Sequence, residues 1–509
     1  MKLATLFHRP ILPLAGERSK EQAMGLLYTV IGLLAGGMLV YSQTQAFHYD
    51  EGFHILTADL ITRGKRPYLD FFFPQTPLNA YWNAAWMKVL GANWRVVHTI
   101  AAIATVGSIL LVGQYLFVLF GKRRWQSAAG LAALALFGLH SLVWQFGTTA
   151  QAYPLCLLAV VAAFRMAIQA VVLPQFWLSL LAGFFAGAGA ASSLLTTPAS
   201  VVLLIWIWRY NRAGNRWLKS GAFMAGAIIP SVPVLVLFVR GPHQVIFNIL
   251  KYHSVYRRVD WEGATGHDIG IVTDWVNSSP SLLLVLLAIA GLFYIKRGGF
   301  DYERCSEFGL CLWLVLAIGA QNLVAHPTFP QYFVFLIPFL TVLAVVGFYG
   351  LATRLENSDS PRRSVLVLLC IMGLCLGNSV YNERDSYTWR QLEKVANKVK
   401  EVTPKDALLL APEQIYFLAR WPAPSGMEHS DASKLQLSAA ENAILHVLPK
   451  AEVDRRIKSG AFSTAVVCAD DSAVSEMDEW KVYSQKADFD ECTVFWQLNP
   501  KTKQSPPQR

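Results

Sequence analysis

The sequence predicts a polytopic α-helical membrane protein with about 11 transmembrane helices and a small C-terminal α/β domain. Of its 509 residues, 54% are hydrophobic and only 15% are charged, whereas soluble globular proteins carry about 25% charged residues. Apolar runs long enough to cross a bilayer, which takes about 20 residues, recur as far as residue 381. The polar remainder, residues 382–498, has the patterns of helices and strands.

The first apolar run, residues 23–47, contains no charged residue. It is longer than the core of a usual signal peptide, and no clear A-x-A cleavage site follows it, so we interpret it as an uncleaved anchor. Residues 1–22 then form a cytoplasmic N-terminus. Ten further runs complete the membrane domain of residues 23–381: about 95–120, 126–146, 153–170, 176–193, 196–209, 218–239, 280–295, 305–323, 331–351 and 364–381.

The basic residues predict the orientation of the chain. Lys and Arg cluster in alternate loops, namely 122–124, 209–219, 296–304 and 354–363. Because positively charged loops stay in the cytoplasm, residues 382–498 should form an extracytoplasmic domain. The net charge of +10 lies in the membrane part, since residues 382–509 hold 17 Lys and Arg against 19 Asp and Glu. The charge is therefore a topology signal, and no nucleic-acid partner is implied.

The first outer loop, residues 48–94, is long for a helical bundle, where connections of 2–8 residues are usual. It begins with "HYDEGFH", in which Asp50 suits the N-cap of a short amphipathic helix that runs to Arg63. A second helix is predicted at 78–90. Both helices are too short to span a bilayer, so we expect them to lie on the membrane surface.

The C-terminal region reads as a small α/β domain followed by a disordered tail at 499–509. A helix is predicted at 385–402 and strands at 407–412, 464–470 and 492–498. Cys468 and Cys492 lie in two of these strands. Outside the cytoplasm they can form a disulfide if the strands are neighbours.

The order of these features resembles the GT-C superfamily of membrane glycosyltransferases. A first span is followed by "DEG", a surface helix, "PYLDFFFPQTPLNAYW", a second span from Trp94 and the basic turn "GKRRW". The late segment "HPTFPQYFVFLIPFL" at 326–340 is similar to that family's late outer loop. The closest branch looks like the aminoarabinose transferases and protein O-mannosyltransferases (glycosyltransferase family 39-like). Two residues depart from the pattern of this branch. Gln75 stands where relatives of the aminoarabinose type carry Lys, and Gln151 stands where many relatives carry an acidic residue.

The resemblance implies inverting transfer of a sugar from a polyprenyl-phosphate donor to a glycan, lipid or protein acceptor at the outer face of the membrane. It also implies a bacterial inner (plasma) membrane, with membrane lipids as further partners. Such a reaction needs a carboxylate that accepts the proton of the acceptor hydroxyl. Asp50 is the predicted base. Glu51 is predicted to orient the acceptor or to share a divalent cation with Asp50.

A cation must balance the charge that grows on the departing phosphate. The candidates are Arg257 and Arg258 on the outer loop 240–280, then Lys65 and Arg66 after the first surface helix. For all four, attraction to anionic lipid headgroups is the alternative. Further substrate-binding candidates lie in the two outer loops: His54, Gln75, His326, Gln331 and Tyr332.

Three other functions compete with this hypothesis. A transporter or flippase of lipid-linked sugars would place polar or charged residues near mid-membrane, and the predicted spans hold almost none. A polymerase or ligase of lipid-linked glycans would usually carry its large loop late in the chain. A catalytically inactive relative would keep the fold, and the sequence leaves this alternative open because of Gln75 and Gln151.

Overall fold

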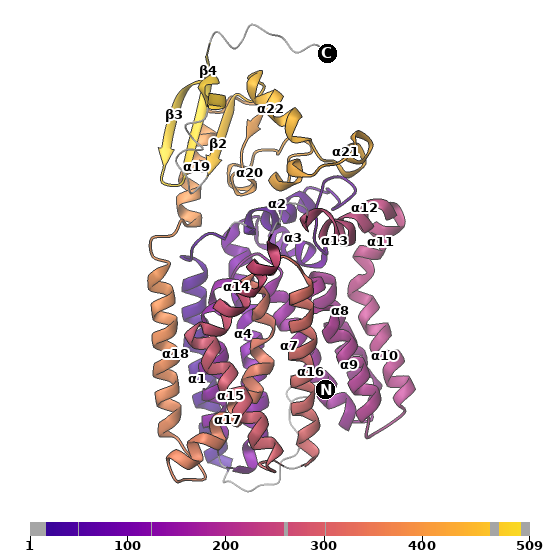
Figure 1. Cartoon of the computed structure of the whole chain (residues 1–509), viewed down its shortest axis with the longest axis vertical. Coiled ribbons are helices and arrows are strands. Elements are labelled where there is room, and N and C mark those ends of the chain that lie inside the picture. The colour runs from indigo at the N-terminus through magenta and orange to yellow at the C-terminus, as the bar shows by residue number, and fades with distance from the viewer. Residues whose placement is uncertain are drawn as a thin grey trace.

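The computed structural model describes residues 17–48, 50–123, 125–258, 263–300, 302–468 and 478–499. Long helices run side by side and form a bundle, and the C-terminal domain covers one end of it (Figure 1). Of the predicted N-terminal segment, residues 1–16 lie outside the described residues, as do residues 500–509 of the predicted tail. Asn499 is described and ordered, because its backbone N–H donates to the carbonyl of Val482 at 2.8 Å.

The bundle contains the helices that the apolar runs predict. They are α1 (Glu17–Ser42), α4 (Trp94–Leu119), α5 (Gln126–Ala133), α6 (Ser141–Phe146), α7 (Tyr153–Val172), α8 (Phe176–Ser192), α9 (Thr197–Tyr210), α10 (Arg216–Ile228), α11 (Val232–Arg240), α15 (Ser279–Lys296), α16 (Tyr302–Val324), α17 (Ile337–Leu355) and α18 (Arg363–Asn382). Among the described residues, eight helical segments are long and apolar enough to cross a membrane, and three shorter apolar segments accompany them. Each overlaps one predicted run, while the number that crosses the membrane stays a prediction.

Two predicted spans are interrupted. The run 218–239 breaks into α10 and α11 at the 3₁₀ turn Ile229–Ser231, where Pro230 cannot donate a helical hydrogen bond. The run 126–146 passes through the π-helical turn Leu134–Gly138 between α5 and α6. Hydropathy reports only the apolar length of a run, so neither interruption is visible in it.

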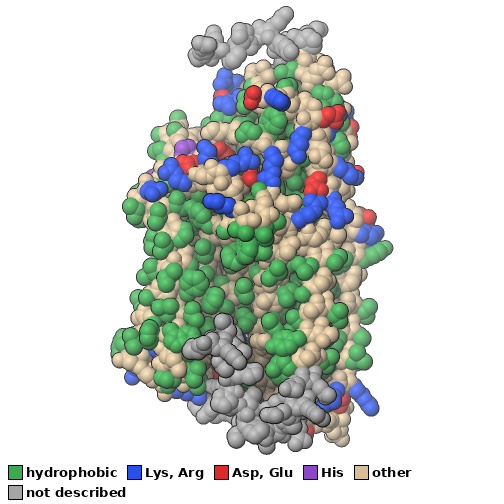
Figure 2. Space-filling view, turned by 180° about the vertical axis from the view of Figure 1, so that it is seen from behind, with side chains coloured by type: hydrophobic (Ala, Val, Ile, Leu, Met, Phe, Trp, Pro, Cys, Tyr) green, Lys and Arg blue, Asp and Glu red, His purple; other side chains and the backbone are tan. Residues whose placement is uncertain are grey.

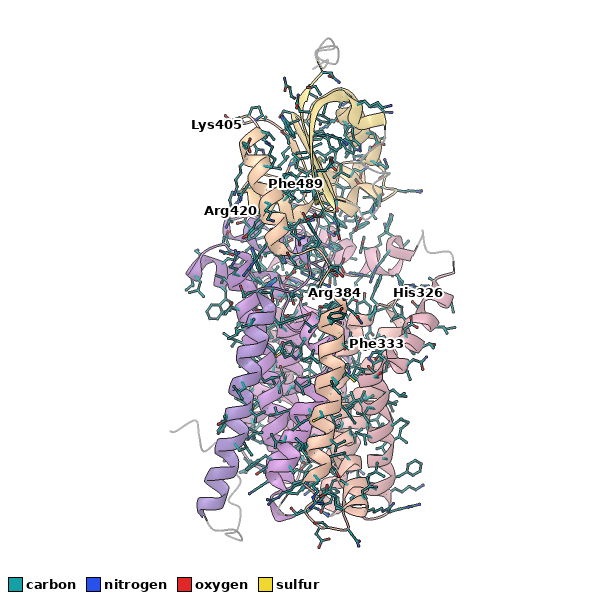
Figure 3. All side chains as sticks on the ribbon, turned by 90° about the vertical axis from the view of Figure 1, so that its left-hand side faces the viewer. His326, Phe333, Arg384, Lys405, Arg420 and Phe489 are labelled. Atoms are coloured by element: carbon teal, nitrogen blue, oxygen red, sulfur yellow. A yellow bond between two sulfur atoms is a disulfide. The ribbon has the colours of Figure 1, made fainter. Side chains whose placement is uncertain are left out.

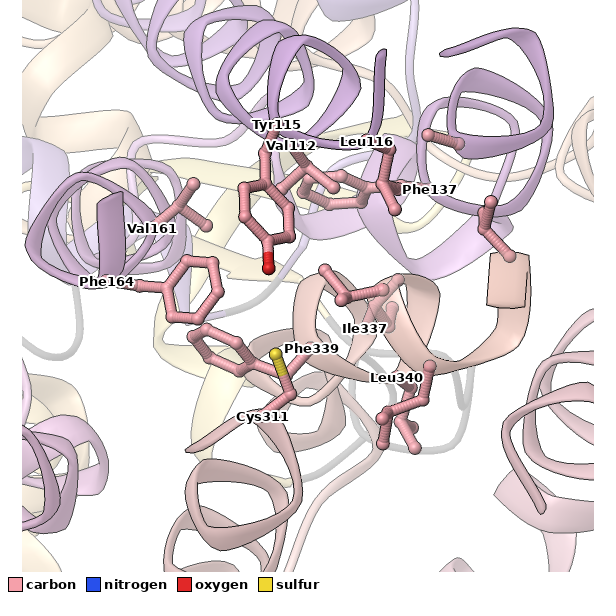
Figure 4. Close-up of a cluster of buried hydrophobic side chains, with 14 of the residues drawn as sticks. Val112, Tyr115, Leu116, Phe137, Val161, Phe164, Cys311, Ile337, Phe339 and Leu340 are labelled. Carbon is pink, nitrogen blue, oxygen red and sulfur yellow. The ribbon is translucent and has the colours of Figure 1, made fainter. Parts of the chain in front are cut away.

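The core of the bundle is a continuous cluster of large apolar side chains. Figure 4 shows Tyr115 of α4, Phe164 of α7 and Phe339 of α17 converging with Phe137 of the π-helical turn. Small residues allow the closest helix contacts. A Cβ on Gly291 of α15 would lie 2.1 Å from the carbonyl oxygen of Leu343 in α17. This packed core makes the bundle a scaffold on which the outer loops are held.

The outer loops form a layer between the bundle and the C-terminal domain (Figure 1). It contains α2 (Glu51–Thr62), α3 (Leu78–Leu90), α12 (Pro242–Ile246) and α13 (Tyr252–Ser254). Two further outer-loop helices, α14 (Ala264–Asn277) and the 3₁₀ helix η8 (Pro330–Phe335), lead into α15 and α17. The two predicted surface helices match α2 and α3. However, α2 is covered by the C-terminal domain, since a Cβ on Gly52 would lie 2.6 Å from the side-chain oxygen of Gln414. The amphipathic pattern of α2 marks a buried face but does not reveal what covers it.

The C-terminal domain is α/β, as predicted. It contains α19 (Trp389–Val402), β1 (Leu409–Leu410), α20 (Glu413–Ala419), the 3₁₀ helix η9 (Ser430–Lys434), α21 (Ala439–Leu445), α22 (Lys450–Lys458), β2 (Thr464–Cys468), β3 (Tyr483–Phe489) and β4 (Cys492–Leu498). The sheet order is β1-β2-β4-β3, and only the β1–β2 pair is parallel. Figure 3 shows Arg384 where the chain leaves α18, and Lys405 and Phe489 within the domain.

The disulfide between Cys468 and Cys492 is present. The two residues are directly paired across β2 and β4, so the condition set by the sequence, neighbouring strands, is met. Strand β3 was not predicted. Its sequence, "YSQKADF", is largely polar and its side chains are mostly exposed, so it lacks the apolar signal that marks the other strands.

Candidate functional site

The candidate site is the surroundings of Asp50 at the outer end of the bundle, which we call the recess and define by the groups that act on the Asp50 carboxylate. Asp50 is accessible to solvent, and yet protein surrounds its carboxylate closely enough that burial raises its pKa. Arg257, His429 and His48 act in the opposite direction and lower the pKa, while Asp431 raises it further. Charged and titratable groups from distant parts of the chain therefore act on this carboxylate.

Asp50 occupies the N-cap position of α2, but its side chain makes no capping hydrogen bond. Its backbone is already helical, with φ −63° and ψ −13°, whereas a capping side chain normally needs an extended backbone at this residue. The expected capping role of Asp50 is therefore wrong. The carboxylate is left facing the recess.

Glu51 has a different environment, although it is the next residue. Its side chain is fully buried. One oxygen accepts hydrogen bonds from His98 Nε2 at 2.5 Å and from the backbone N–H of Ala150 at 2.6 Å, and the other accepts from Trp389 Nε1 at 2.8 Å. Burial alone would raise the pKa of Glu51, but the His98 imidazole and these hydrogen bonds together hold it below its ordinary value.

The Glu51 network joins five parts of the chain. His98 Nδ1 lies 2.6 Å from the carbonyl oxygen of Ser42, which can only accept, so this nitrogen donates. Through His98, Ala150 and Trp389, the end of α1, α2, α4, the segment before α7 and α19 meet at one carboxylate. With both oxygens engaged, this geometry does not favour contact with an acceptor or a cation. It makes Glu51 a residue that positions Asp50.

Arg257 is the predicted cation that the structure places beside Asp50. Its Nη2 donates to the hydroxyl of Tyr332 at 2.8 Å, and its guanidinium lies 5.2 Å from the ring centroid of Phe329. Burial alone would lower the pKa of Arg257, but Tyr332, Tyr252 and Asp50 together keep it above its usual value. Tyr332 is 7% exposed. Asp50, Arg257 and Tyr332 come from three different outer loops, and the fold brings them together as predicted candidates.

The other predicted phosphate contacts lie elsewhere. Arg66 forms a two-point ion pair with Asp70, with Nη2 2.7 Å from Oδ1 and Nε 3.0 Å from Oδ2, at the protein surface. Lys65 is exposed at the end of α2 and acts electrostatically on Glu428. The side chain of Arg258 lies outside the part of the chain that the structure describes. Of the four predicted cations, the described structure thus supports Arg257.

The remaining predicted residues have different environments. His54 is buried, stacks on Phe53 with ring centroids 4.2 Å apart, and has its pKa lowered by burial to about 3. The ring of His326 is hydrogen-bonded to the Asp268 carboxylate, which also accepts a hydrogen bond from the backbone N–H of Thr328 at 2.6 Å. His326 therefore holds the late outer loop together (labelled in Figure 3). Gln75 and Gln331 are partly exposed.

Some residues at the recess were not predicted from the sequence. His429 and Asp431 belong to the segment "GMEHSDASK" of the C-terminal domain, and Tyr252 belongs to α13; all three interact electrostatically with Asp50 or its neighbours. Their short polar segments match no motif. Gln151, noted as a departure from the family pattern, is 3% exposed and its Oε1 is buried without a hydrogen-bond partner in the described structure.

A separate cleft of about 280 Å³ lies between the α3–α4 turn and the C-terminal domain. Its lining includes Asn93, Trp94, Glu393, Lys400, Phe417 and Arg420. One wall is held by an ion pair between Arg95 and Glu393 with an N–O distance of 2.6 Å. None of the candidate residues above lines this cleft, so we place the chemistry at Asp50, where the titratable groups converge.

Known structures resemble this fold. No family model matches the chain, and no curated protein sequence matches it. The structure of ArnT from Cupriavidus metallidurans bound to undecaprenyl phosphate has a TM-score of 0.64 and 14% identity, and covers 93% of this chain and 97% of its own. Its apo state has a TM-score of 0.67 and 12% identity, with coverages of 94% and 98%.

A second, more distant neighbour is the archaeal oligosaccharyltransferase AglB. The structure of AglB from Archaeoglobus fulgidus with an inhibitory peptide and a dolichol-phosphate has a TM-score of 0.52 and 13% identity, and covers 92% of this chain and 73% of its own. Both neighbours are membrane glycosyltransferases of the GT-C type. The chain therefore has the GT-C fold, as its sequence predicted.

Proposed function

We propose that this protein transfers a sugar from a polyprenyl-phosphate-linked donor to a hydroxyl of a glycan, lipid or protein acceptor at the outer face of the membrane. The observation that carries the proposal is the convergence of Asp50 with the Arg257–Tyr332 pair in one recess. The fold supports it, because neighbours with the same fold were solved with undecaprenyl phosphate and dolichol-phosphate.

The reaction is a single displacement. The acceptor oxygen attacks the anomeric carbon, a new C–O bond forms, and the bond between that carbon and the donor phosphate oxygen breaks. The electron pair leaves on the phosphate, and Asp50 accepts the proton of the acceptor hydroxyl. Attack from the face opposite the phosphate inverts the configuration. The raised pKa of Asp50 suits this role, since a stronger base takes the proton more readily.

Arg257 balances the negative charge that grows on the phosphate. A guanidinium can grip two phosphate oxygens at once, and fixed charges of this kind stabilise the transition state because they need no reorganisation. The hydroxyl of Tyr332 and the ring of Phe329 hold the guanidinium in place.

The metal dependence of the reaction stays a prediction. Among the residues that the structure describes, no group of three or more His, Cys, Asp or Glu side chains is arranged to hold one. The shared divalent cation stays a prediction in which Asp50 is the ligand, since the Glu51 oxygens accept other hydrogen bonds. Transfer rates with and without EDTA test it.

Arg257→Gln and Tyr332→Phe test the phosphate site. We expect Arg257→Gln to slow transfer by about 100-fold or more, the scale of losing one transition-state contact, and to weaken binding of undecaprenyl phosphate. Tyr332→Phe should have a smaller effect in the same direction. Arg66→Gln removes the same charge from the surface and is the matched control. The measurements are product formation by mass spectrometry and lipid binding by the purified full-length protein.

The donor and the competing functions need two further experiments. Mass spectrometry of lipid-linked sugars and surface glycans, with and without the gene, should show a donor that accumulates only in its absence. A measurement of lipid-linked sugar transport in liposomes distinguishes the flippase alternative from the transferase. A protein that moves a lipid-linked sugar across the bilayer and never converts it would contradict the proposal.

A further inference from the structure

A loop of the C-terminal domain, residues 426–434, reaches the recess around Asp50. Its conformation is fixed by hydrogen bonds, because the Glu413 side chain accepts from the backbone N–H of Ser430 at 2.6 Å and that of Glu428 from Gly426 at 2.8 Å. The neighbouring α20 packs directly on Gly52 of α2. This loop, which we call the capping loop, is therefore held against the residues that follow Asp50.

His429 is a buried residue of the capping loop that packs against α2. It is 7% exposed, and its ring packs against Phe53 and Phe72 with centroids 4.8 and 5.7 Å away. It interacts electrostatically with Asp50 and with His54. Asp431, two residues later, faces the same carboxylate.

The Nδ1 atom of His429 is buried and has no hydrogen-bond partner in the described part of the chain. Buried polar atoms are nearly always paired, because an unpaired one costs free energy. His54 Nδ1 and Gln151 Oε1 are buried and unpaired in the same way. His429 Nδ1 is thus a polar atom of the capping loop that the described part of the protein does not satisfy.

The directions from which the two substrates approach assign the capping loop to one of them. A donor on a polyprenyl chain must reach the recess from the membrane, and Arg257 with Tyr332 is the phosphate site on the loops of the bundle. The capping loop belongs to the domain beyond the end of the bundle (Figure 1). It therefore faces an acceptor hydroxyl that lies outside the hydrocarbon of the bilayer, whether on a glycan, a protein or a lipid headgroup.

We propose that the capping loop forms the acceptor side of the site and that His429 Nδ1 hydrogen-bonds the acceptor beside the hydroxyl that Asp50 deprotonates. This inference rests on the proposed function. It assigns one part of the recess to the donor and the other part to the acceptor. Arg257 and Tyr332 hold the donor phosphate. His429 and Asp431 orient the acceptor.

Two substitutions at His429 separate packing from hydrogen bonding. His429→Phe keeps a ring between Phe53 and Phe72 but removes the nitrogen, whereas His429→Asn places an amide near the position of Nδ1. His446→Asn makes the same change at the end of α21, where a left-handed backbone (φ 55°) is one that Asn tolerates. Each full-length variant is expressed in a host that lacks the gene. Sugar transferred to the envelope is measured by mass spectrometry, and melting and undecaprenyl phosphate binding are measured on purified protein.

We expect His429→Phe to bind undecaprenyl phosphate and to melt like the wild type while transfer falls on the order of tenfold, the loss of one hydrogen bond. His429→Asn should recover most of the transfer, and His446→Asn should be unchanged. Wild-type transfer by His429→Phe would overturn the inference, and so would loss of lipid binding in that variant. A wild-type protein that neither binds the lipid nor transfers sugar would overturn the proposed function, and the inference with it.

Discussion

Asp50 and Glu51 are adjacent and have opposite surroundings. Successive residues of a helix point about 100° apart, so Asp50 faces the recess while Glu51 faces the protein interior. One carboxylate is free to react and the other is fixed by three donors. The "DE" pair is therefore one reactive group and one anchor.

Substitution of Asp50 should separate catalysis from stability. Asp50→Asn keeps the size of the side chain but cannot accept a proton, so transfer should fall by about 10²–10⁴-fold, the usual contribution of a general base. Asp50→Ala should be equally inactive. Because the side chain makes no capping bond and burial disfavours its charge, neither variant should melt below the wild type. The measurement is transfer by purified protein in detergent alongside thermal melting.

The outcome for Asn is decisive. An Asp50→Asn variant that transfers sugar at the wild-type rate would contradict the role of Asp50 as the base. Loss of melting temperature in Asp50→Ala would instead indicate a structural role that the geometry does not show.

At this scale the sequence predicts the residues that follow a family pattern or break the charge pattern. Asp50, Arg257 and Tyr332 were identified in this way, and the structure places them together. The partners of Glu51 could not be predicted, since Trp389 is 338 residues away. His429 could not be predicted either, because a single histidine in a polar loop belongs to no motif and has no partner at a characteristic spacing.

Helix α2 is the element on which the site depends. It is held from below by the Glu51–His98 pair of the bundle and from above by Trp389 and Gln414 of the C-terminal domain. Its bounds were predictable because Asp50 and Gly64 flank an amphipathic run. Its burial was not, because the covering domain is encoded more than 300 residues later.

Removal of the Glu51 carboxylate should loosen this element. Glu51→Ala leaves His98, Trp389 and the Ala150 N–H without their acceptor, which costs about 3 kcal/mol or more for a buried charged group. Melting temperature and transfer should therefore fall together, unlike in Asp50→Asn. Trp389→Phe removes one hydrogen bond and should cost about 1–2 kcal/mol. A stable but inactive Glu51→Ala protein would show instead that Glu51 touches the substrate.

The capping loop should dock less firmly as pH rises. Burial raises the pKa of Glu428 to about 7, whereas a Glu side chain in an unfolded chain has a pKa of about 4.3. Between these values the folded state holds a proton that the unfolded state has released. This carboxyl therefore weakens the fold progressively as pH rises through that window, and the whole penalty is present above it.

Glu428→Gln cannot ionise and should escape this penalty. The variant should melt at a higher temperature than the wild type at pH 8, and the two should converge toward pH 5. Each pKa unit corresponds to about 1.4 kcal/mol, so the gain is at most about 4 kcal/mol. Melting of both proteins across this pH range is the measurement. A difference that does not change with pH would contradict the assignment.

The surface of the whole molecule is divided into zones along its long axis. Hydrophobic side chains cover the middle of the bundle, with charged side chains concentrated toward both ends (Figure 2). Leu33, Val239, Leu366 and Leu374 are 65–82% exposed, as expected of side chains that face lipid. This pattern is that of an integral membrane protein, and the sequence predicted it because hydropathy depends on composition alone.

The two ends of the molecule differ in charge, and this difference predicts its orientation. The basic loops gather at the end opposite the C-terminal domain. Arg123 donates to the carbonyl of Gly299, and Trp125 donates to that of Pro361, so the turns after α4, α15 and α17 meet there. Positively charged loops are retained in the cytoplasm. The recess and the C-terminal domain should therefore face the outside.

Fusion of a reporter that is active only after export tests this orientation. Lys405 is exposed on the C-terminal domain (Figure 3), and Arg212 is exposed in the turn between α9 and α10. A fusion at Lys405 should be active and one at Arg212 inactive. The Cys468–Cys492 disulfide agrees with export, since such bonds persist mainly outside the cytoplasm. An inactive fusion at Lys405 together with an active one at Arg212 would show that the molecule has the opposite orientation in the membrane. Asp50 and Arg257 would then open to the cytoplasm, and a sugar transfer at the outer face could not take place in this recess.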